Sequence, residues 1–322
     1  EIKGMAHSFN VMSEVPPTIG GVRRQSLREL RNMEMTTLGR TGLEVSRFGL
    51  GAGGSARLGT GAPDGERDAV RLVRAALDAG VNFIDTAEVY GTEDAIGKAI
   101  AGRRQEIVLS SKKFPRDLTA ESIREGLDAS LKRLGTDYLD IYHLHGVRPD
   151  HYADVCDVAI PVLHDLQRAG KIRHLGVTEL FEQDTSHSML QRALIDDVFD
   201  VVMVGFNLLN PSARRLVFPQ TRARNVGVLV MFAVRAALSR PERLAGILAE
   251  LLERGEIPEG ATLDFLGDAA AITEAGYRFC RHEPGVDVVL GGTSRIDHLL
   301  ANLAAMERGP LSASALAELE RL

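Results

Sequence analysis

Short strand-like runs and amphipathic helical segments alternate along most of this chain. The strand-like runs lie at 45–50, 82–85, 107–111, 138–143, 172–177, 201–204, 226–231 and 286–290. The helical segments lie at 66–79, 94–101, 120–134, 155–169, 189–195, 212–224, 241–254, 263–280, 296–306 and 313–322. About eight strand–helix units is the number at which parallel strands can close into a barrel instead of an open sheet. The sequence therefore predicts an α/β fold of the (β/α)8 TIM-barrel type.

Two additions to the barrel are expected. Runs at 35–38 and 43–45 flank the turn residues 39–42, which predicts an N-terminal hairpin. The stretch between the last two strands is too long for one helix, so extra helices are expected near the C-terminus. No composition shift or proline-rich linker interrupts 34–322, which predicts one barrel domain. Residues 1–33 have no clear period and are expected to be an extension, either mobile or added to the natural chain.

Charge and cysteine content exclude several classes of partner and site. A net charge of -6 and a pI of about 5.9 argue against nucleic acid or an anionic membrane as the main partner. No apolar run approaches the roughly 20 residues that span a bilayer. Cys156 and Cys280 match no metal or redox spacing, which favours free thiols, no metal site and a reducing compartment. We therefore expect a soluble, cytoplasmic protein.

A glycine-rich run follows the first predicted core strand. Residues 49–54 satisfy the pattern G-x-G-x-x-G, which is typical of dinucleotide-binding loops. In such loops the glycines open directly into a helix, whereas 55–65 here is loop-like and contains Gly59, Gly61 and Pro63. The run therefore favours a loop over a site, or simple turn glycines, rather than a Rossmann fold.

Four side chains suited to proton transfer lie at or just beyond the carboxyl ends of three successive predicted strands: Asp85, Tyr90, Lys112 and His145. Taken singly, each has a structural explanation, but side chains at these ends converge at the mouth of a barrel. A tyrosine is normally protonated at neutral pH and becomes a better acid beside a cation. Lys112 could supply that charge, Asp85 could hold Lys112, and a neutral His145 could orient a substrate oxygen or join a proton relay.

Three segments, at 38–46, 82–91 and 137–145, resemble those of the aldo-keto reductase family, and the similarity extends over about 35–303. The resemblance implies a nicotinamide cofactor bound by a barrel, and a catalytic tetrad. The matching tetrad is Asp85, Tyr90, Lys112 and His145.

Two of these assignments have neighbouring alternatives. The family's pattern of a small residue followed by lysine points to Lys112, with Lys113 as the alternative. The family's spacing from Asp140 points to His145, but His143 shares its face of the strand, so strand alternation leaves His143 open.

The resemblance also implies a set of cofactor contacts. They are Gly51, Asp85, Thr178, Glu179, Phe206, Arg235, Gly292, Thr293, Ser294, Arg295 and Asn302. In the family, the turn matching Thr178 and Glu179 holds the nicotinamide carboxamide, and an aromatic ring at a position matching Phe206 stacks on the nicotinamide. Backbone amides or Arg235 are expected at the pyrophosphate. Residues 291–302 match the segment that binds the adenosine end.

Two of these residues bear on the adenosine end in particular. Arg295 suits a 2′-phosphate, and Asn302 could bond the adenine. NADP(H) is therefore favoured, with NAD(H) open. The chain departs from the family's pattern at four positions, which are Glu179, Met203, Val234 and Ala301.

The sequence thus predicts an NADP(H)-dependent oxidoreductase that interconverts an aldehyde or ketone and an alcohol. Tyr90 is the expected general acid and base, and the expected partner is a small carbonyl or alcohol substrate. A nicotinamide-binding regulatory subunit with little turnover is one alternative. A non-redox barrel lyase or isomerase is the other.

Overall fold

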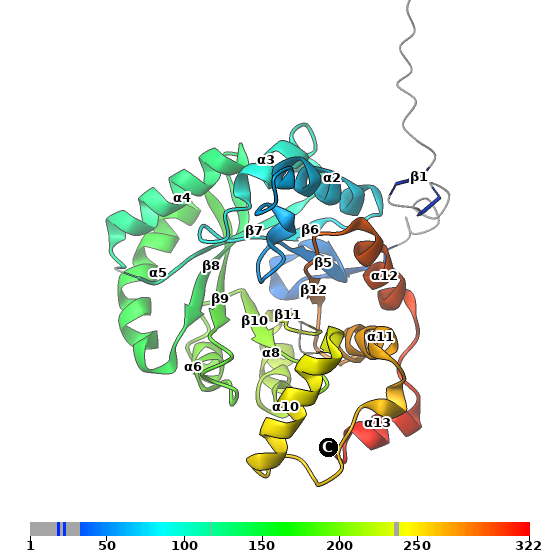
Figure 1. The fold of residues 1–322 in the computed structure, drawn as a ribbon. Helices are drawn as coiled ribbons and strands as arrows, with labels where there is room; N and C mark the ends of the chain where they lie inside the picture. Colours follow the sequence, from blue (N-terminus) through cyan, green and yellow to red (C-terminus); the bar gives the residue numbers. More distant parts are fainter. Residues whose placement is uncertain (1–17, 20–21, 24–32, 117, 235–237) are drawn as a thin grey trace, which may run out of the picture.

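A closed barrel of eight parallel strands forms the centre of the protein (Figure 1). The computed structural model describes residues 18–19, 22–23, 33–116, 118–234 and 238–322. The barrel strands are β5 (Phe48–Gly51), β6 (Phe83–Asp85), β7 (Val108–Lys113), β8 (Leu139–Val147), β9 (Ile172–Glu179), β10 (Val201–Gly205), β11 (Gly227–Met231) and β12 (Val288–Gly291). Each strand pairs with its neighbours in chain order, and β12 returns to β5. The predicted (β/α)8 barrel is confirmed.

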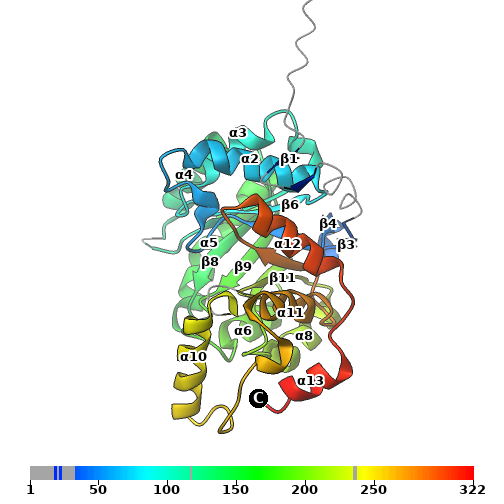
Figure 2. The same cartoon turned by 45° about the vertical axis from the view of Figure 1, so that its right-hand side comes forward.

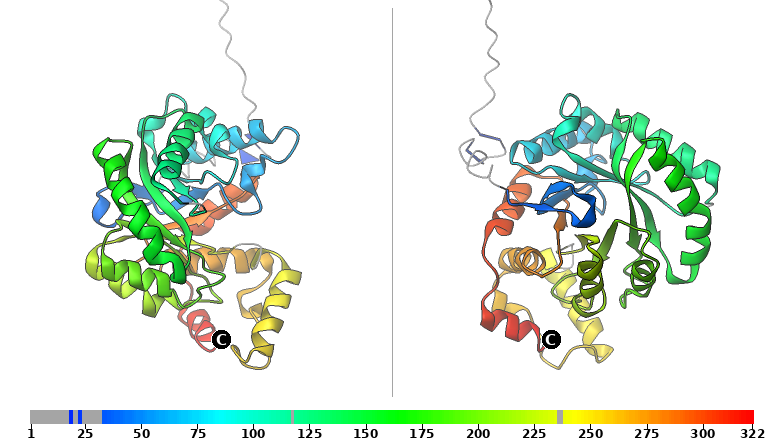
Figure 3. Two further views of the ribbon diagram at one scale, coloured as in Figure 1. Left: turned by 90° about the vertical axis from the view of Figure 1, so that its left-hand side faces the viewer. Right: turned by 180° about the vertical axis from the view of Figure 1, so that it is seen from behind.

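Helices cover the outside of the barrel, as Figures 1 and 3 show. They are α2 (Gly65–Asp78), α3 (Glu93–Ile100), α4 (Ala120–Leu134), α5 (Tyr152–Arg168), α6 (Ser188–Asp196), α7 (Ala213–Leu216), α8 (Phe218–Arg224), α10 (Pro241–Glu253), α11 (Ala269–Arg281), α12 (Ile296–Glu307) and α13 (Ala313–Leu319). The bounds of α4 match the prediction because both ends are specified locally. Thr119 and Ser122 form a reciprocal cap at its start, and Gly135 ends it in the left-handed conformation.

The predicted N-terminal hairpin is present. It closes the end of the barrel at which the strands begin, which is the lower end of the barrel. Strands β3 (Met35–Thr37) and β4 (Glu44–Ser46) pair in antiparallel fashion around a short 3-10 turn. Leu38 and Val45 from the hairpin join an apolar cluster with residues near the starts of the barrel strands, such as Phe83. Gly227 makes room for the hairpin, because a Cβ on this residue would lie 2.8 Å from the Leu38 side chain. The open, polar end of the barrel is therefore the carboxyl end of the strands.

The first predicted core strand is wrong in one respect, because 45–50 belongs to two strands. β4 pairs with the hairpin, whereas β5 pairs with β6 and β12 in the barrel. The chain changes direction at Ser46 and Arg47, where the Ser46 hydroxyl donates a hydrogen bond of 2.7 Å to the Phe48 carbonyl. Strands β1 (Thr18–Ile19) and β2 (Val22–Arg23) form a separate antiparallel pair within the N-terminal extension.

Two predicted helices are divided. The segment 212–224 forms α7 and α8, which are separated at Val217. Pro219, the second residue of α8, has no backbone N–H to continue the helical ladder of α7. The segment 263–280 begins with a 3-10 turn, and Gly267 then takes a φ of 107°. A new cap at Asp268, whose carboxylate accepts from the Ala271 N–H at 2.9 Å, starts α11.

The region between β11 and β12 supplies the extra helices that were expected. α10 stands at the edge of the molecule in Figure 3, and Leu244 is its buried residue. α11 and α12 pack against each other (Figure 2), and α11 also contacts β12.

Close packing of α3 on α4 gives a first testable prediction. A Cβ on Gly97 in α3 would lie 2.5 Å from the Arg133 carbonyl oxygen in α4, so Gly97→Ala forces the two helices apart. We expect the free energy of unfolding to fall by about 1–3 kcal/mol, measured by urea denaturation. Gly246→Ala in α10 is the matched control, because nothing lies within 4 Å of its added methyl group. There the higher helix propensity of alanine should stabilise the protein by about 0.5–1 kcal/mol. Equal effects at the two positions would contradict this account.

Candidate active site

Three adjacent barrel strands bring the four predicted catalytic residues to the carboxyl end of the barrel. Asp85 is the last residue of β6, Lys112 lies near the end of β7, and His145 lies in the last third of β8. Tyr90 lies in the turn after β6. All four side chains thus come from neighbouring elements at the same end of the barrel.

Lys112 and Asp85 form a buried ion pair. The Lys112 Nζ lies 2.7 and 2.6 Å from the two Asp85 carboxylate oxygens and donates a third hydrogen bond of 2.6 Å to the Thr86 carbonyl. The Ser110 hydroxyl also donates to Asp85 at 2.9 Å. Burial raises the pKa of the Asp85 carboxyl, while the Lys112 ammonium and the Ser110 hydroxyl oppose that rise. The Lys112 ammonium is therefore held in place and shielded from water. An ammonium held in this way can stabilise a negative charge that forms on a neighbouring group.

Tyr90 lies above this pair with its hydroxyl directed at His145. Its Oη is 3.1 Å from His145 Nε2, and the Lys112 Nζ is 5.2 Å from the centre of its ring. Gly53 allows the ring to lie there, since a Cβ at that position would be 2.6 Å from two ring carbons. Burial raises the pKa of the Tyr90 hydroxyl, and Lys112 acts in the opposite direction. The phenol is thus protonated at neutral pH, next to a cation that eases loss of its proton.

His145 is held as a neutral imidazole. Burial, and then the Lys112 charge, lower its pKa from 6.5 to about 3. Its ring stands edge-on to both Tyr90 and Phe114, with interplanar angles of 84° and 87°. Within the described part of the chain, Nδ1 has no hydrogen-bond partner. A neutral His145 can share a proton with Tyr90 without adding a second cation beside Lys112.

The neighbouring alternatives take other positions. Lys113 points to Glu88, with its Nζ 3.2 Å from Oε1. His143 lies fully buried in the barrel, where neither ring nitrogen has a partner among the described residues. Its ring occupies the space that Gly176 leaves, because a Cβ on Gly176 would be 2.1 Å from Nδ1. Lys112 and His145, rather than Lys113 and His143, therefore lie with Asp85 and Tyr90.

The buried His143 predicts a pH dependence of stability. Burial, together with the Lys112 charge, holds the pKa of His143 well below 6.5. Below pH 6.5 the His143 imidazole is therefore protonated in the unfolded chain but stays neutral in the folded protein. Stability should therefore fall as the pH drops below about 6.5. His143→Leu should remove about 1 kcal/mol per pH unit of that slope near pH 5, measured by urea unfolding from pH 8 to pH 5. The control His164→Leu, on an exposed position of α5, should leave the slope unchanged. His145 is buried with a lowered pKa as well and keeps part of the slope, so a slope left unchanged by His143→Leu would contradict the prediction.

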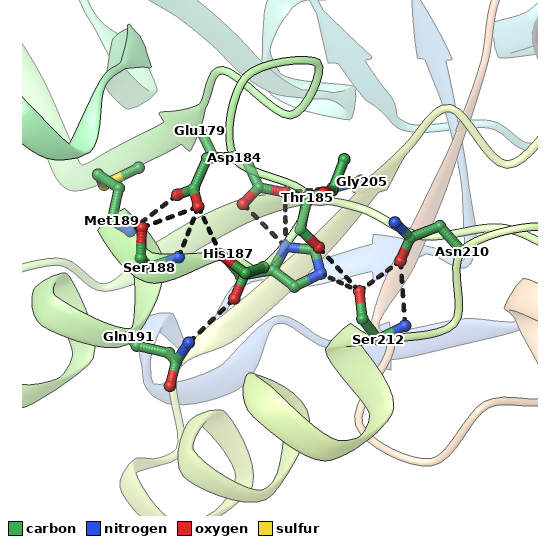
Figure 4. A network of polar contacts seen from close by, with 11 residues as sticks. Glu179, Asp184, Thr185, His187, Ser188, Met189, Gln191, Gly205, Asn210 and Ser212 are labelled. Atoms are coloured by element: carbon green, nitrogen blue, oxygen red, sulfur yellow. Dashed lines mark hydrogen bonds and ion pairs between the residues drawn. The ribbon is translucent and has the colours of Figure 1, made fainter. Parts of the chain in front are cut away.

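The last two residues of β9, Thr178 and Glu179, depart from what the sequence suggested. The Thr178 hydroxyl accepts a hydrogen bond of 2.6 Å from the Gly146 N–H. The Glu179 side chain is sealed from solvent, at 0% exposure, and does not face the mouth of the barrel. Figure 4 shows Glu179 accepting from the Gly205 N–H at 2.7 Å and lying 2.9 Å from His187 Nδ1. Because successive residues of a strand face opposite sides, Thr178 faces inward and Glu179 faces outward.

His187 and Ser212, which the sequence did not single out, complete this network. His187 Nε2 lies 2.8 Å from the Ser212 hydroxyl, and the Ser212 hydroxyl also donates to the Asn210 side chain (Figure 4). With Nδ1 on Glu179 and Nε2 on Ser212, this histidine, which directly precedes α6, links the end of β9 to the residue before α7. Burial raises the pKa of the Glu179 carboxyl, and the contact with His187 acts against that rise.

Phe206, which was expected at the nicotinamide, and Met203, one of the four departures from the family's pattern, are also buried. Phe206 is 0% exposed and packs under the helices, with its ring stacked on Phe279 at 5.2 Å and edge-on to Phe218 at 5.0 Å. Met203 lies in the apolar cluster at the lower end of the barrel. Two partly exposed rings, Phe181 and Phe232, lie instead on this side of the mouth. The signal for Phe181 in the sequence was weak, because it lies in a loop.

The residues expected at the phosphate and adenosine end lie close together. Gly51 and Gly292 lie close together, because a Cβ on Gly292 would be 3.0 Å from the Gly51 carbonyl oxygen. Ser294 is exposed, and the Thr293 hydroxyl accepts from the Arg295 N–H at 3.1 Å just before α12 begins. The Thr293 and Ser294 hydroxyls and the N-terminal backbone amides of α12 offer hydrogen-bond donors of the kind that bind phosphate.

Three other features of this end affect a phosphate ligand. The exposed Arg295 pairs with Asp297 at 3.0 Å, so part of its charge is already compensated. Asn302 lies half-buried on α12. Arg235 lies outside the described residues.

In the part of the chain that the structure describes, there is no group of three acidic, histidine or cysteine side chains that could hold a metal, and no helix long and apolar enough to cross a membrane.

Comparisons with known proteins agree with this architecture. Residues 49–322 match the sequence pattern of the Aldo/keto reductase family. L-galactose dehydrogenase of Arabidopsis thaliana is 28% identical over 288 residues, which cover 86% of this chain and 89% of that enzyme. The holo form of aldo-keto reductase AKR11C1 from Bacillus halodurans has a TM-score of 0.71 at 28% identity, covering 90% of this chain and 96% of that one. An aldo-keto reductase from Klebsiella pneumoniae in complex with NADPH has a TM-score of 0.67 at 26% identity, with 90% and 94% covered.

Proposed function

Because this chain belongs to the aldo/keto reductase family, we propose that it is an NADP(H)-dependent oxidoreductase that interconverts an aldehyde or ketone with an alcohol. The observation that carries the proposal is the position of Tyr90, whose hydroxyl lies 3.1 Å from His145 Nε2 above the buried Lys112–Asp85 pair. NADPH in the Klebsiella pneumoniae relative supports the choice of cofactor.

The four residues divide the work of proton transfer. Bound NADP(H) supplies or accepts the hydride. Tyr90 gives its proton to the carbonyl oxygen in reduction and takes it back in oxidation. Lys112 stabilises the phenolate that remains on Tyr90, and Asp85 keeps Lys112 in place. The neutral His145 orients the substrate oxygen through Nε2.

The cofactor is proposed to lie across the mouth, from the start of α12 towards Tyr90. Its phosphate end would rest on backbone and hydroxyl groups at Gly51, Gly292, Thr293 and Ser294, of which Gly292 and Ser294 are exposed, with Arg295 and Asn302 nearby. Thr178 and Asp85 lie at the nicotinamide end. These groups fit a phosphate-bearing ligand because backbone amides and hydroxyls are the donors that bind phosphate at the start of a helix. Glu179 and Phe206 contribute by packing, since both are sealed inside the protein.

The proposal is tested with purified protein, NADPH, NADH and a panel of sugar, aromatic and steroid carbonyls. We expect NADPH to bind, as seen in its nicotinamide fluorescence, and at least one carbonyl to be reduced with loss of nicotinamide absorbance. Tight NADPH binding with negligible turnover on every carbonyl would favour a regulatory subunit instead. Failure to bind either nicotinamide cofactor would contradict the proposal and favour a non-redox barrel enzyme.

A further inference from the structure

A second ion pair, which the proposed reaction does not use, lies beside the pair that holds Lys112. Glu88 is in the turn after β6, two residues before Tyr90, and Lys113 is the last residue of β7. The Lys113 Nζ lies 3.2 and 3.4 Å from the two Glu88 carboxylate oxygens. Both side chains are largely buried, at 14% exposure for Glu88 and 11% for Lys113. The pair therefore joins the turn that carries Tyr90 to the strand that carries Lys112.

The Glu88 carboxylate also holds the backbone that follows β7. Its Oε1 accepts a hydrogen bond of 2.9 Å from the Phe114 N–H. The Phe114 ring stands edge-on to His145, with ring centres 5.9 Å apart. His145 Nε2 in turn lies 3.1 Å from the Tyr90 hydroxyl. A continuous series of contacts thus runs from Glu88 to the two groups that are proposed to act on the substrate oxygen.

Backbone hydrogen bonds hold the Tyr90 turn less firmly than this carboxylate does. The Tyr90 N–H donates to the Ala87 carbonyl at 3.0 Å, which closes the turn on itself. The Glu88 N–H donates to the Lys112 carbonyl, but at 3.4 Å, beyond the usual range for such a bond. The contacts of the Glu88 side chain are shorter, and the acceptor carries a charge, which strengthens a hydrogen bond.

A glycine in α4 leaves the space in which the pair lies. Neighbouring residues of a strand face opposite sides, so Lys112 points into the barrel and Lys113 points outward to α4. A Cβ on Gly126 of α4 would lie 2.8 Å from Glu88 Oε2 and 3.2 Å from Lys113 Nζ. Glycine inside a helix is less stable than alanine, so its presence here is explained by the room that it leaves for the pair.

We propose that Glu88 is a positioning residue for the reaction. Lys113 and the space at Gly126 fix the Glu88 carboxylate, and the carboxylate fixes the Phe114 backbone and the turn that carries Tyr90. Glu88 acts through these residues and takes no part in proton transfer itself. This inference rests on the proposed function, since it requires that the Tyr90 hydroxyl gives its proton to a carbonyl oxygen.

The first test measures kcat, KM and the dissociation constant of NADPH for Glu88 variants of the whole protein, with the carbonyl that the parent reduces best. Glu88→Leu removes both side-chain contacts and should lower kcat by about 10- to 100-fold, because small displacements of reacting groups slow a reaction steeply. The NADPH constant should stay within about twofold of the parent value, since Glu88 acts on the proton-transfer groups. Glu88→Gln keeps an oxygen that accepts from the Phe114 N–H, so kcat should stay within about 5-fold.

Glu125→Gln is the matched control for the Glu88 variants. Glu125 is an exposed residue of α4, next to Gly126, and its replacement should change none of the three values. Thermal melting of each variant shows how much of the protein is folded at the assay temperature. A purely structural role of Glu88 would lower the melting temperature and leave kcat of the folded protein unchanged.

The second test moves the pair without altering it. Gly126→Ala places a methyl group against the Glu88 carboxylate and should lower kcat by about 3- to 10-fold, with the NADPH constant unchanged. Gly246→Ala in α10 is the control, because nothing lies within 4 Å of its methyl group, and it should keep the parent kcat. This test decides the matter if Glu88→Leu does not fold.

A third measurement asks whether Glu88 and Lys113 act as one unit. Lys113→Met should lower kcat less than Glu88→Leu does, because the Phe114 N–H still has its acceptor. Adding Lys113→Met to Glu88→Leu should lower kcat by no more than about twofold further, since the pair is already broken. Losses that multiply in the double variant would overturn the role of Lys113 in fixing the carboxylate.

Four outcomes would overturn the inference as a whole. They are an unchanged kcat in folded Glu88→Leu, an unchanged kcat in Gly126→Ala, a loss in Glu88→Gln as large as in Glu88→Leu, and a loss of NADPH affinity that matches the loss of kcat. If the parent protein reduces no carbonyl, the proposed function fails, and the inference fails with it. An active parent with an equally active Glu88→Leu contradicts the inference alone.

Discussion

Tyr90→Phe is expected to lower turnover by about 100- to 10,000-fold, the range that a positioned general acid contributes. The change removes one oxygen and its proton and keeps the ring that lies against Gly53. Asp85 and Lys112 retain their contacts with each other, since their pair does not depend on the phenol. His145 loses its contact with the Tyr90 hydroxyl. Steady-state turnover on the best carbonyl of the panel measures the loss, and NADPH fluorescence should show a dissociation constant close to that of the parent.

Tyr138→Phe is the matched control for this prediction. Tyr138 precedes β8 at the opposite end of the barrel, where its ring lies 4.0 Å from the Arg104 guanidinium and 4.2 Å from that of Arg173. Loss of its hydroxyl should leave turnover unchanged, because the proposed reaction takes place at the carboxyl ends of the strands. Turnover by Tyr90→Phe within about twofold of the parent would remove Tyr90 from the proposed role, since even the low end of the range is much larger.

The sequence predicted the barrel because its signal is repeated in each strand–helix unit. An error in one unit, such as the joined strand at 45–50 or the undivided helix at 212–224, leaves the register of the other units unchanged. The positions of the four residues proposed for proton transfer could also be predicted from the sequence, because each lies within a few residues of a strand end. Side chains at the carboxyl ends of neighbouring parallel strands meet whatever the details of the loops.

The side of the barrel mouth that was expected to bind the nicotinamide could not be predicted from the sequence in the same way. Whether Glu179 faces the mouth or the helices depends on where the inward alternation of β9 ends, which a shift of one residue reverses. Phe206 faces outward from β10 by the same alternation, so its ring packs on Phe218 and Phe279. Phe181 and His187 come from one loop. The stacking of their rings, and the contact of Phe181 with Gly205, depend on a loop path that no periodic pattern encodes.

Lys112→Met is expected to lower the free energy of unfolding by about 3–5 kcal/mol and to abolish turnover, because it leaves the Asp85 carboxylate buried without its cation. Lys112 is 0% exposed and Asp85 is 3% exposed, so water cannot replace the lost ammonium. The Ser110 hydroxyl remains as a donor to Asp85, but a single neutral hydrogen bond compensates only part of a buried charge. Urea unfolding of the cofactor-free protein at pH 7 measures the stability change.

The double variant Asp85→Asn with Lys112→Met isolates the buried charge as the cause. Removing both charges should recover much of the stability lost in Lys112→Met, while turnover stays absent, since no cation then lies beside Tyr90. Lys98→Met is the surface control. Lys98 pairs with Glu66 where the side chains are 58% and 55% exposed, so its loss should cost no more than about 1 kcal/mol. Equal stability losses for Lys112→Met and Lys98→Met would contradict the buried pair, and retention of turnover in Lys112→Met would show that Tyr90 transfers its proton without a neighbouring cation.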